Sequence, residues 1–360
     1  LIQCFIVIIV LFFLKIPMTN YLNNKGLFSM FYPLLFSCVL NVLSFYLISY
    51  LNGFRLLKIF FWLNITATFF SSSIALYFIL SDFAYGKLSV YFLTLYSGNF
   101  LFISVFLFFK FFKFSFFSEF FSSFSTLKRL YKIGVVLTIY SIFEQTYNVW
   151  LRVYITENFG LEKLGIFHSS YSLSLMYVSI FITILSKDFM PAIAEFGHEK
   201  SRINQYIKKY ILFLFFICLP IVLFLILFSR QLFYIFFSPE FYSGILLFEI
   251  LCVVSFMKIL LFPIGFAVLG IGDTHAFVRQ GPVVLILNTI LCFTALPKYG
   301  LISYSYISII CIIISWLWGY SYIGKINNFK LPYKYFIIFL FTLVLLFSTI
   351  YLKYTFFKSS

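Results

Sequence analysis

Charged side chains are scarce in this sequence of 360 residues: Asp, Glu, Lys and Arg together make up only 10% of it. Soluble globular domains carry about 25% charged residues, so the chain lacks the polar surface of a soluble fold. Hydrophobic residues make up 63%, and the mean hydropathy is +1.05. No soluble core could take up this much apolar surface. The sequence therefore predicts an all-α, integral membrane protein.

Sequence motifs for common enzyme and metal chemistry are also missing. The chain has no Gly-rich phosphate loop, no His/Glu zinc motif, no G-x-S-x-G motif and no clustered carboxylates. Its six cysteines stand singly in apolar runs, and no C-x-x-C spacing indicates a metal site or a disulfide framework. The three histidines lie far apart. We expect no catalytic residues, no metal and no cofactor.

The net charge of +15 would suggest a nucleic-acid partner in a soluble protein. Here the Lys and Arg residues stand between hydrophobic runs, so the positive-inside rule explains the charge. The loops between successive hydrophobic runs alternate between the two sides of the membrane and so form two sets. One set holds about twice as many basic residues as the other, and the rule places the richer set in the cytoplasm. We therefore expect a bilayer and no nucleic acid as a partner.

Hydrophobic runs recur along the whole chain. Because a helix needs about 20 apolar residues to cross the hydrocarbon core, the sequence predicts about eleven spans. The first is short and has no initiator Met before it, so we expect a chain truncated at its N-terminus. The predicted spans are residues 1–14, 29–50, 57–80, 87–109, 131–155, 163–188, 209–230, 244–270, 276–296, 300–323 and 335–353.

Polar side chains line one side of the predicted span 131–155. At 100° per residue, Glu144, Asn148 and Arg152 fall with five other polar residues in an arc of roughly 160°. Such a face lines a cavity or pairs with another polar face. Glu144 lies near the middle of the span, where an uncompensated charge costs about 2.5–3.5 kcal/mol. Alternatively, Glu144 joins two helices and Arg152 is an anchor near the outer surface.

Lys258 lies near the centre of the predicted span 244–270, too deep for its side chain to reach the surface easily. It either pairs with Glu144 across helices or projects positive charge into a cavity. Asparagines near span centres are expected to form hydrogen bonds between helices; these are Asn41, Asn64, Asn99 and Asn288. Residues 192–208 suit a short surface helix or a solvated connector.

Short motifs in a fixed order resemble a known family. They are "LNGFR" at 51–55, "FG" at 159–160, "LGIF" at 164–167, Pro191 opening a cytoplasmic helix, and "FFSPEF" at 236–241. Together they resemble the O-antigen or polysaccharide flippases of the multidrug/oligosaccharidyl-lipid/polysaccharide exporter superfamily over nearly all of 29–323. Lys258 stands where one branch of the family carries a Lys. Two features depart from the family pattern: Ser303 replaces a Gly, and span 335–353 exceeds a twelve-span plan.

The resemblance implies two six-helix bundles around a central cavity. On that plan residues 1–115 are the remainder of the N-terminal bundle and 116–130 are a cytoplasmic linker. Residues 131–325 form the C-terminal bundle, and 326–360 are an extra transmembrane helix and tail.

The resemblance also implies a function. An undecaprenyl-pyrophosphate-linked oligosaccharide, such as an O-antigen or other surface-polysaccharide repeat unit, is flipped across the bacterial inner (cytoplasmic) membrane by alternating access. The expected substrate-cavity residues are Arg152, Lys258 and Asn148, because positive charge attracts pyrophosphate. Glu144 is the expected ion-coupling residue. A polysaccharide polymerase and a chain-length regulator are candidate partners.

Two other functions stay open at this point. A cation-coupled multidrug exporter has the same fold, but its cavity favours acidic residues. A membrane O-antigen polymerase has a similar composition but usually carries a large outer loop, whereas the predicted outer loops here are short. We therefore expect a transporter and not an enzyme.

Overall fold

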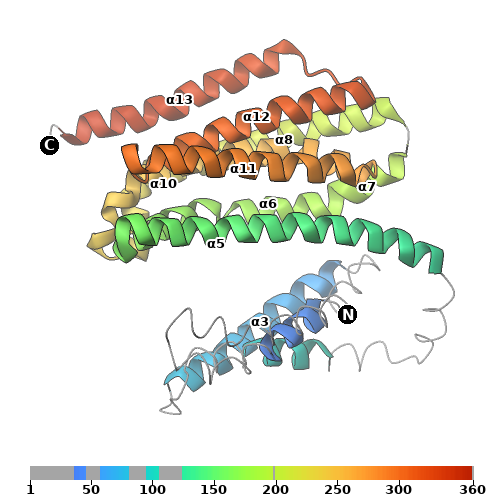
Figure 1. The fold of residues 1–360 in the computed structure, drawn as a ribbon, viewed down its shortest axis with the longest axis horizontal. Coiled ribbons are helices and arrows are strands. Elements are labelled where there is room, and N and C mark those ends of the chain that lie inside the picture. The colour runs from blue at the N-terminus through green and yellow to red at the C-terminus, as the bar shows by residue number, and fades with distance from the viewer. Residues whose placement is uncertain (1–35, 46–56, 81–94, 105–123, 198, 359–360) are drawn as a thin grey trace. The chain divides into compact units, whose positions relative to one another are not determined.

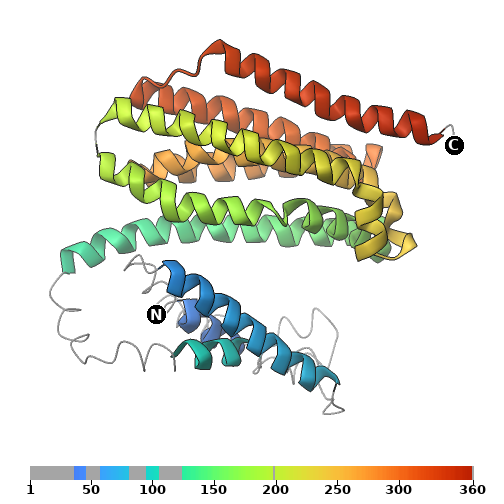
Figure 2. The same ribbon diagram turned by 180° about the vertical axis from the view of Figure 1, so that it is seen from behind.

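The computed structural model describes residues 36–45, 57–80, 95–104, 124–197 and 199–358. All regular secondary structure in these ranges is helical, which confirms the all-α prediction for them. The chain divides into two compact units, Leu1–Ser123 and Phe124–Ser360 (Figures 1 and 2). Each unit is described by itself.

In the first unit, helices occupy residues 36–45 and 95–104 and α3 (Leu57–Leu80). The bounds of α3 are those of the predicted span 57–80. The hydroxyl of Ser71 on α3 donates a hydrogen bond to Oδ1 of Asn99 at 3.1 Å, which confirms the interhelical role expected for Asn99. The predicted span 1–14 lies outside the described residues.

The second unit begins with α5 (Phe124–Leu175), a long helix with two arms that meet at Gly160. Gly160 has φ 85° and ψ 167°, a backbone conformation open almost only to glycine, so the chain turns there. The arms correspond to the predicted spans 131–155 and 163–188. Of the predicted linker 116–130, residues 124–130 form the first turns of α5 and the rest lies outside the described residues.

The second arm of α5 continues through three short helical segments: α6 (Val178–Ile184), the π-helical η2 (Leu185–Phe189) and α7 (Met190–Phe196). Next comes α8 (Lys200–Leu227). The prediction of one surface helix or connector over 192–208 was wrong. Gly197, at φ 57°, ends α7, and the residues from Lys200 onward form the start of α8.

The remaining elements are α9 (Ser229–Phe236), the short 3-10 helix η3 (Pro239–Gly244) and four long helices. The long helices are α10 (Ile245–Gly270), α11 (Thr274–Tyr299), α12 (Ser303–Asn327) and α13 (Tyr333–Lys358). Every predicted span within the described residues contains a helix. Five helices among these residues are apolar and long enough to cross a membrane: Lys200–Leu227, Pro239–Gly270, Arg279–Tyr299, Ser303–Asn327 and Phe336–Thr355.

Helix α10 forms the core of the second unit. It is apolar on all sides, the pattern of a helix surrounded by other helices, and side chains around its whole circumference are buried, among them Val253, Phe256 and Leu260. Helices α5, α8, α11 and α12 pack against it. Helix α13 lies at the edge of the unit beside α8 (Figures 1 and 2).

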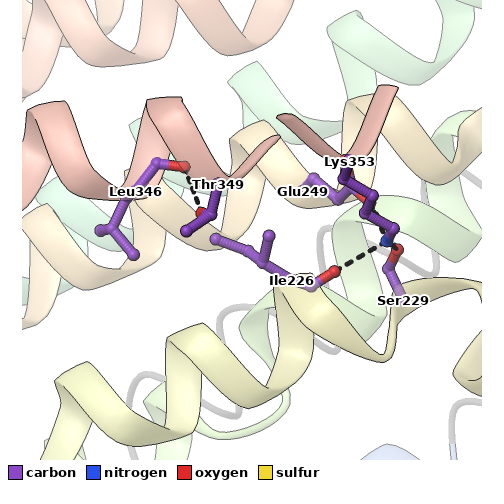
Figure 3. A network of polar contacts seen from close by, with 6 residues as sticks. All are labelled: Ile226, Ser229, Glu249, Leu346, Thr349 and Lys353. Carbon is purple, nitrogen blue, oxygen red and sulfur yellow. Dashed lines mark hydrogen bonds and ion pairs between the residues drawn. The ribbon is translucent and has the colours of Figure 1, made fainter. Parts of the chain in front are cut away.

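A buried ion pair attaches α13 to the rest of the unit. The Nζ of Lys353 on α13 lies 2.6 Å from Oε1 of Glu249 on α10, and the Glu249 side chain is fully buried. The ammonium also donates to the hydroxyl oxygen of Ser229 at 2.5 Å and to the carbonyl oxygen of Ile226 at 2.8 Å (Figure 3). The three hydrogen bonds use all three N–H groups of the lysine.

We predict that Lys353→Ala destabilises the protein by about 3–5 kcal/mol, because it leaves a buried carboxylate without its counter-charge. Thermal unfolding of the purified protein measures the loss, with Lys209→Ala, an exposed lysine on α8, as the matched control. The double variant Glu249→Met/Lys353→Met should recover most of the stability, since an apolar pair of similar volume removes the unpaired charge. A Lys353→Ala protein as stable as the wild type contradicts this assignment.

Candidate functional site

The second unit contains a cavity of about 410 Å³ between α5, α10, α11 and α12. Three of the residues expected to form the site line it: Glu144 and Asn148 on α5, and Lys258 on α10. All three side chains are half-buried. The cavity therefore holds one cation, one carboxylate and, with Gln280 and Asn288, three amides within a largely apolar helical unit.

Glu144 and Lys258 share this cavity without forming an ion pair. In the described part of the chain, neither side chain lies within 4 Å of an oppositely charged group, and neither makes a side-chain hydrogen bond. Asn148 likewise makes no side-chain hydrogen bond to a described residue. Lys258 thus lines the cavity and does not pair with Glu144.

Arg152 does not line this cavity and is exposed. The interior face of α5 is marked by Leu151 and Ile155, which are 3% and 0% exposed. At 100° per residue, Arg152 is rotated about 100° from Leu151. The polar arc predicted from the sequence thus overlaps the interior face at Glu144 and Asn148, but its other edge, with Gln145 and Arg152, points away from it.

Helix α12 supplies a stripe of small and polar residues that the sequence prediction missed. Its members face the cavity at intervals of three or four residues, the spacing of one helical face. That spacing is the signal in the sequence that could have revealed them. They are Tyr304, Ser308, Cys311, Ser315 and Gly319.

Hydrogen bonds across the cavity wall join the helices that form it. The Tyr147 hydroxyl on α5 donates to Oδ1 of Asn288 on α11 at 2.5 Å, and the Cys292 thiol donates to the same oxygen at 3.2 Å. Gln280 on α11 donates to the carbonyl oxygen of Ser315 on α12 at 3.1 Å. Asn288, expected to be structural, forms such a link between helices and also lines the cavity.

Tyr140 and Gly281 bring α5 and α11 into close contact at the cavity wall. Both residues line the cavity, and a Cβ atom at Gly281 would collide with the Tyr140 ring. Only glycine allows the two helices to approach this closely with the tyrosine in place. In this conformation the Tyr140 ring therefore packs directly against α11 at Gly281.

The lining of the cavity is suited to binding a ligand. The described residues include no group of three or more His, Cys, Asp or Glu side chains that could hold a metal ion. The cavity offers an ammonium, a carboxylate, three amides and several aromatic rings, which suit an amphipathic ligand with a charged part.

Comparisons with known proteins give a family and a fold. The model of a family described as "Polysaccharide biosynthesis protein" matches residues 1–245. A solved structure of the lipid II flippase MurJ in an inward closed conformation is similar to this chain, with a TM-score of 0.64. The identity is 17%, and the match covers 98% of this chain and 75% of that one, so it shows a shared multi-span membrane fold. No curated protein matches the sequence.

We predict that Gly281→Ala destabilises the protein by about 1–3 kcal/mol, because the added methyl group overpacks the contact with Tyr140. Thermal unfolding of the purified protein measures the loss. Removing the ring in Tyr140→Ala/Gly281→Ala should restore much of the stability, and Gly134→Ala, where a Cβ meets no atom within 4 Å, should be neutral. Equal losses in Gly281→Ala and the double variant would argue against this contact.

Proposed function

The chain belongs to the polysaccharide biosynthesis protein family, and from this membership and the charged cavity we propose that it translocates a lipid-linked saccharide across a membrane. The substrate we propose is an oligosaccharide repeat unit carried on undecaprenyl pyrophosphate, such as an O-antigen unit. The membrane is the bacterial inner membrane, and the direction is outward. A polymerase and a chain-length regulator would act on the translocated unit.

Lys258 is the observation that carries this proposal. Its ammonium lies midway along α10, the core helix of the unit, and has no counter-ion among the described residues. A lysine at that depth costs about 2.5–3.5 kcal/mol to insert. An anionic ligand in the cavity offsets this cost, and the pyrophosphate of a lipid-linked saccharide supplies two such groups.

The size and lining of the cavity suit part of such a substrate. About 410 Å³ lies within the usual range for small-molecule sites, roughly 300–1,000 Å³, and can hold a pyrophosphate with its adjoining sugar. Asn148 and the serines of α12 offer hydrogen bonds to sugar hydroxyls. In this proposal the polyprenyl tail stays in the lipid while the polar part passes through the protein by alternating access.

Glu144 is the proposed coupling residue. It shares the cavity with Lys258 and has no ion-pair partner in the described ranges. A proton can neutralise it when the cavity is closed to water, and can leave when the cavity opens. The proton gradient would then bias the direction of transport.

Glu144 also supports a second candidate, a multidrug exporter for cationic compounds, since a carboxylate in the cavity attracts cations. The two functions place opposite demands on the cavity. An anionic substrate requires Lys258, whereas a cationic drug requires Glu144 and is repelled by Lys258. Substituting each charge alone therefore separates them.

We predict that Lys258→Gln reduces surface-polysaccharide display about ten-fold or more in a strain whose own copy of the gene is deleted. A hydrogen bond to a charged group contributes about 1.5–3 kcal/mol, which corresponds to roughly ten- to hundred-fold in affinity. Lys298→Gln, an exposed lysine on α11, is the matched control. Arg152→Gln should have a smaller effect, because its side chain lies outside the cavity. Normal display from Lys258→Gln, with drug resistance lost in Glu144→Gln, would favour the drug exporter.

We predict that Glu144→Gln makes saccharide transport independent of the proton gradient. The amide keeps the size of the carboxyl group but takes up no proton. Transport into proteoliposomes, measured with and without an imposed pH gradient, should respond to the gradient in the wild type and the control but not in Glu144→Gln. The control is Gln145→Ala on the exposed side of α5, and an unchanged gradient response in Glu144→Gln excludes this role.

A further inference from the structure

A second cavity, about 880 Å³ in volume, lies where α9, α10 and α13 come together. We name it the outer pocket, because Arg230 and Lys353 on its wall belong to the chain segments that the positive-inside rule places outside the cytoplasm. The outer pocket shares no lining residue with the cavity that contains Lys258.

Glu249, which lines this pocket, has one buried side-chain oxygen without a hydrogen-bond partner among the described residues. Oε1 of Glu249 accepts hydrogen bonds from Lys353 and from the hydroxyl of Ser229 (Figure 3). Oε2 of the same carboxylate is buried and accepts no hydrogen bond from any described residue. Lys353 has no further N–H group to offer, since its three donate to Glu249, Ser229 and Ile226. A buried acceptor of this kind is costly unless a ligand or an ordered water donates to it.

The rest of the lining combines aromatic rings with planar polar groups. Tyr234 and Tyr354 are 77% and 42% exposed, and Tyr242 is half-buried. Gln231 and Arg230 supply N–H donors. Aromatic rings pack against the C–H faces of sugar rings, while amide, guanidinium and carboxylate groups bind hydroxyls, each of which both donates and accepts hydrogen bonds.

The charges on the wall favour a neutral ligand. A phosphate would bring negative charge toward the unpartnered oxygen of Glu249, and a cation would meet Arg230 and Lys353. A polyhydroxylated neutral ligand meets neither repulsion. Its hydroxyls can donate to Glu249 and accept from Gln231.

We propose that the outer pocket binds a neutral saccharide: the glycan part of the lipid-linked substrate after it has crossed the membrane. The identity of the glycan rests on the proposed function. Binding of a free saccharide to the pocket is a separate property, and it can be measured without any translocation. In this scheme the pocket holds the emerging sugars on the outer side and opposes their return.

The test uses the full chain, purified in lipid nanodiscs, and free oligosaccharides released by mild acid from the source cell's own surface polysaccharide. Calorimetric titration should show saturable binding. The double variant Tyr234→Ala/Tyr354→Ala should weaken it about ten-fold, as expected when aromatic contacts central to a site are truncated. Gln231→Ala should weaken it less. Tyr333→Ala, 79% exposed at the opposite end of α13, is the matched control and should bind as the wild type does.

Lys258→Gln separates this inference from the proposed function, because it removes the ammonium proposed to bind pyrophosphate, a group that the free saccharide lacks, and so tests whether saccharide binding depends on the other cavity. One outcome overturns the flippase but supports the pocket. In it the wild type does not translocate in proteoliposomes but binds the saccharide, and the tyrosine double variant does not bind it. Binding that survives the tyrosine double variant, or disappears in Lys258→Gln, overturns the pocket. The pocket is also overturned if the wild type binds no saccharide but retains a phospholipid in native mass spectrometry, and the double variant loses that phospholipid.

Discussion

The high cost of an unpaired charge in a medium without water governs the arrangement of this protein. In the second unit four ionisable groups of the helices meet this constraint in two ways. Lys353 and Glu249 form a buried ion pair between two helices. Lys258 and Glu144 instead face a cavity and have no ion-pair partner among the described residues. Charges of the first kind hold helices together, and charges of the second kind are available to a ligand.

Much of the fold could be predicted from the sequence, because a membrane helix can be recognised by its length and apolar composition. The bounds of α3 equal the predicted span, and the family match confirms that the chain belongs to a polysaccharide biosynthesis family. The helical arc of α5 also indicated Glu144 and Asn148, two residues that line the cavity. A helical wheel shows which residues share a face, but not which edge of that face packs inward, and Arg152 lies on the other edge.

Features that depend on pairing between distant helices could not be predicted in this way. Glu249 and Lys353 lie 104 residues apart, and no local pattern connects them. Lys353 lies near the C-terminal end of α13, whereas Glu249 lies near the N-terminal end of α10. The contact between Tyr140 and Gly281 likewise depends on how α5 packs against α11. The break at Gly197 was missed because nearby polar residues resemble one surface helix.

The π-helical segment η2 keeps a row of buried hydrophobic residues on one face of the helix. Phe181, Leu185, Phe189 and Ile193 recur at every fourth position, and all are buried. In a regular α-helix each step of four residues drifts by about 40°, so Ile193 would lie about 120° round the axis from Phe181. The wider π turn at Leu185–Phe189 counters this drift. The π turn thus lets residues spaced four apart stay on one face of the helix. A one-residue deletion within η2 would rotate α7 as a whole relative to α6.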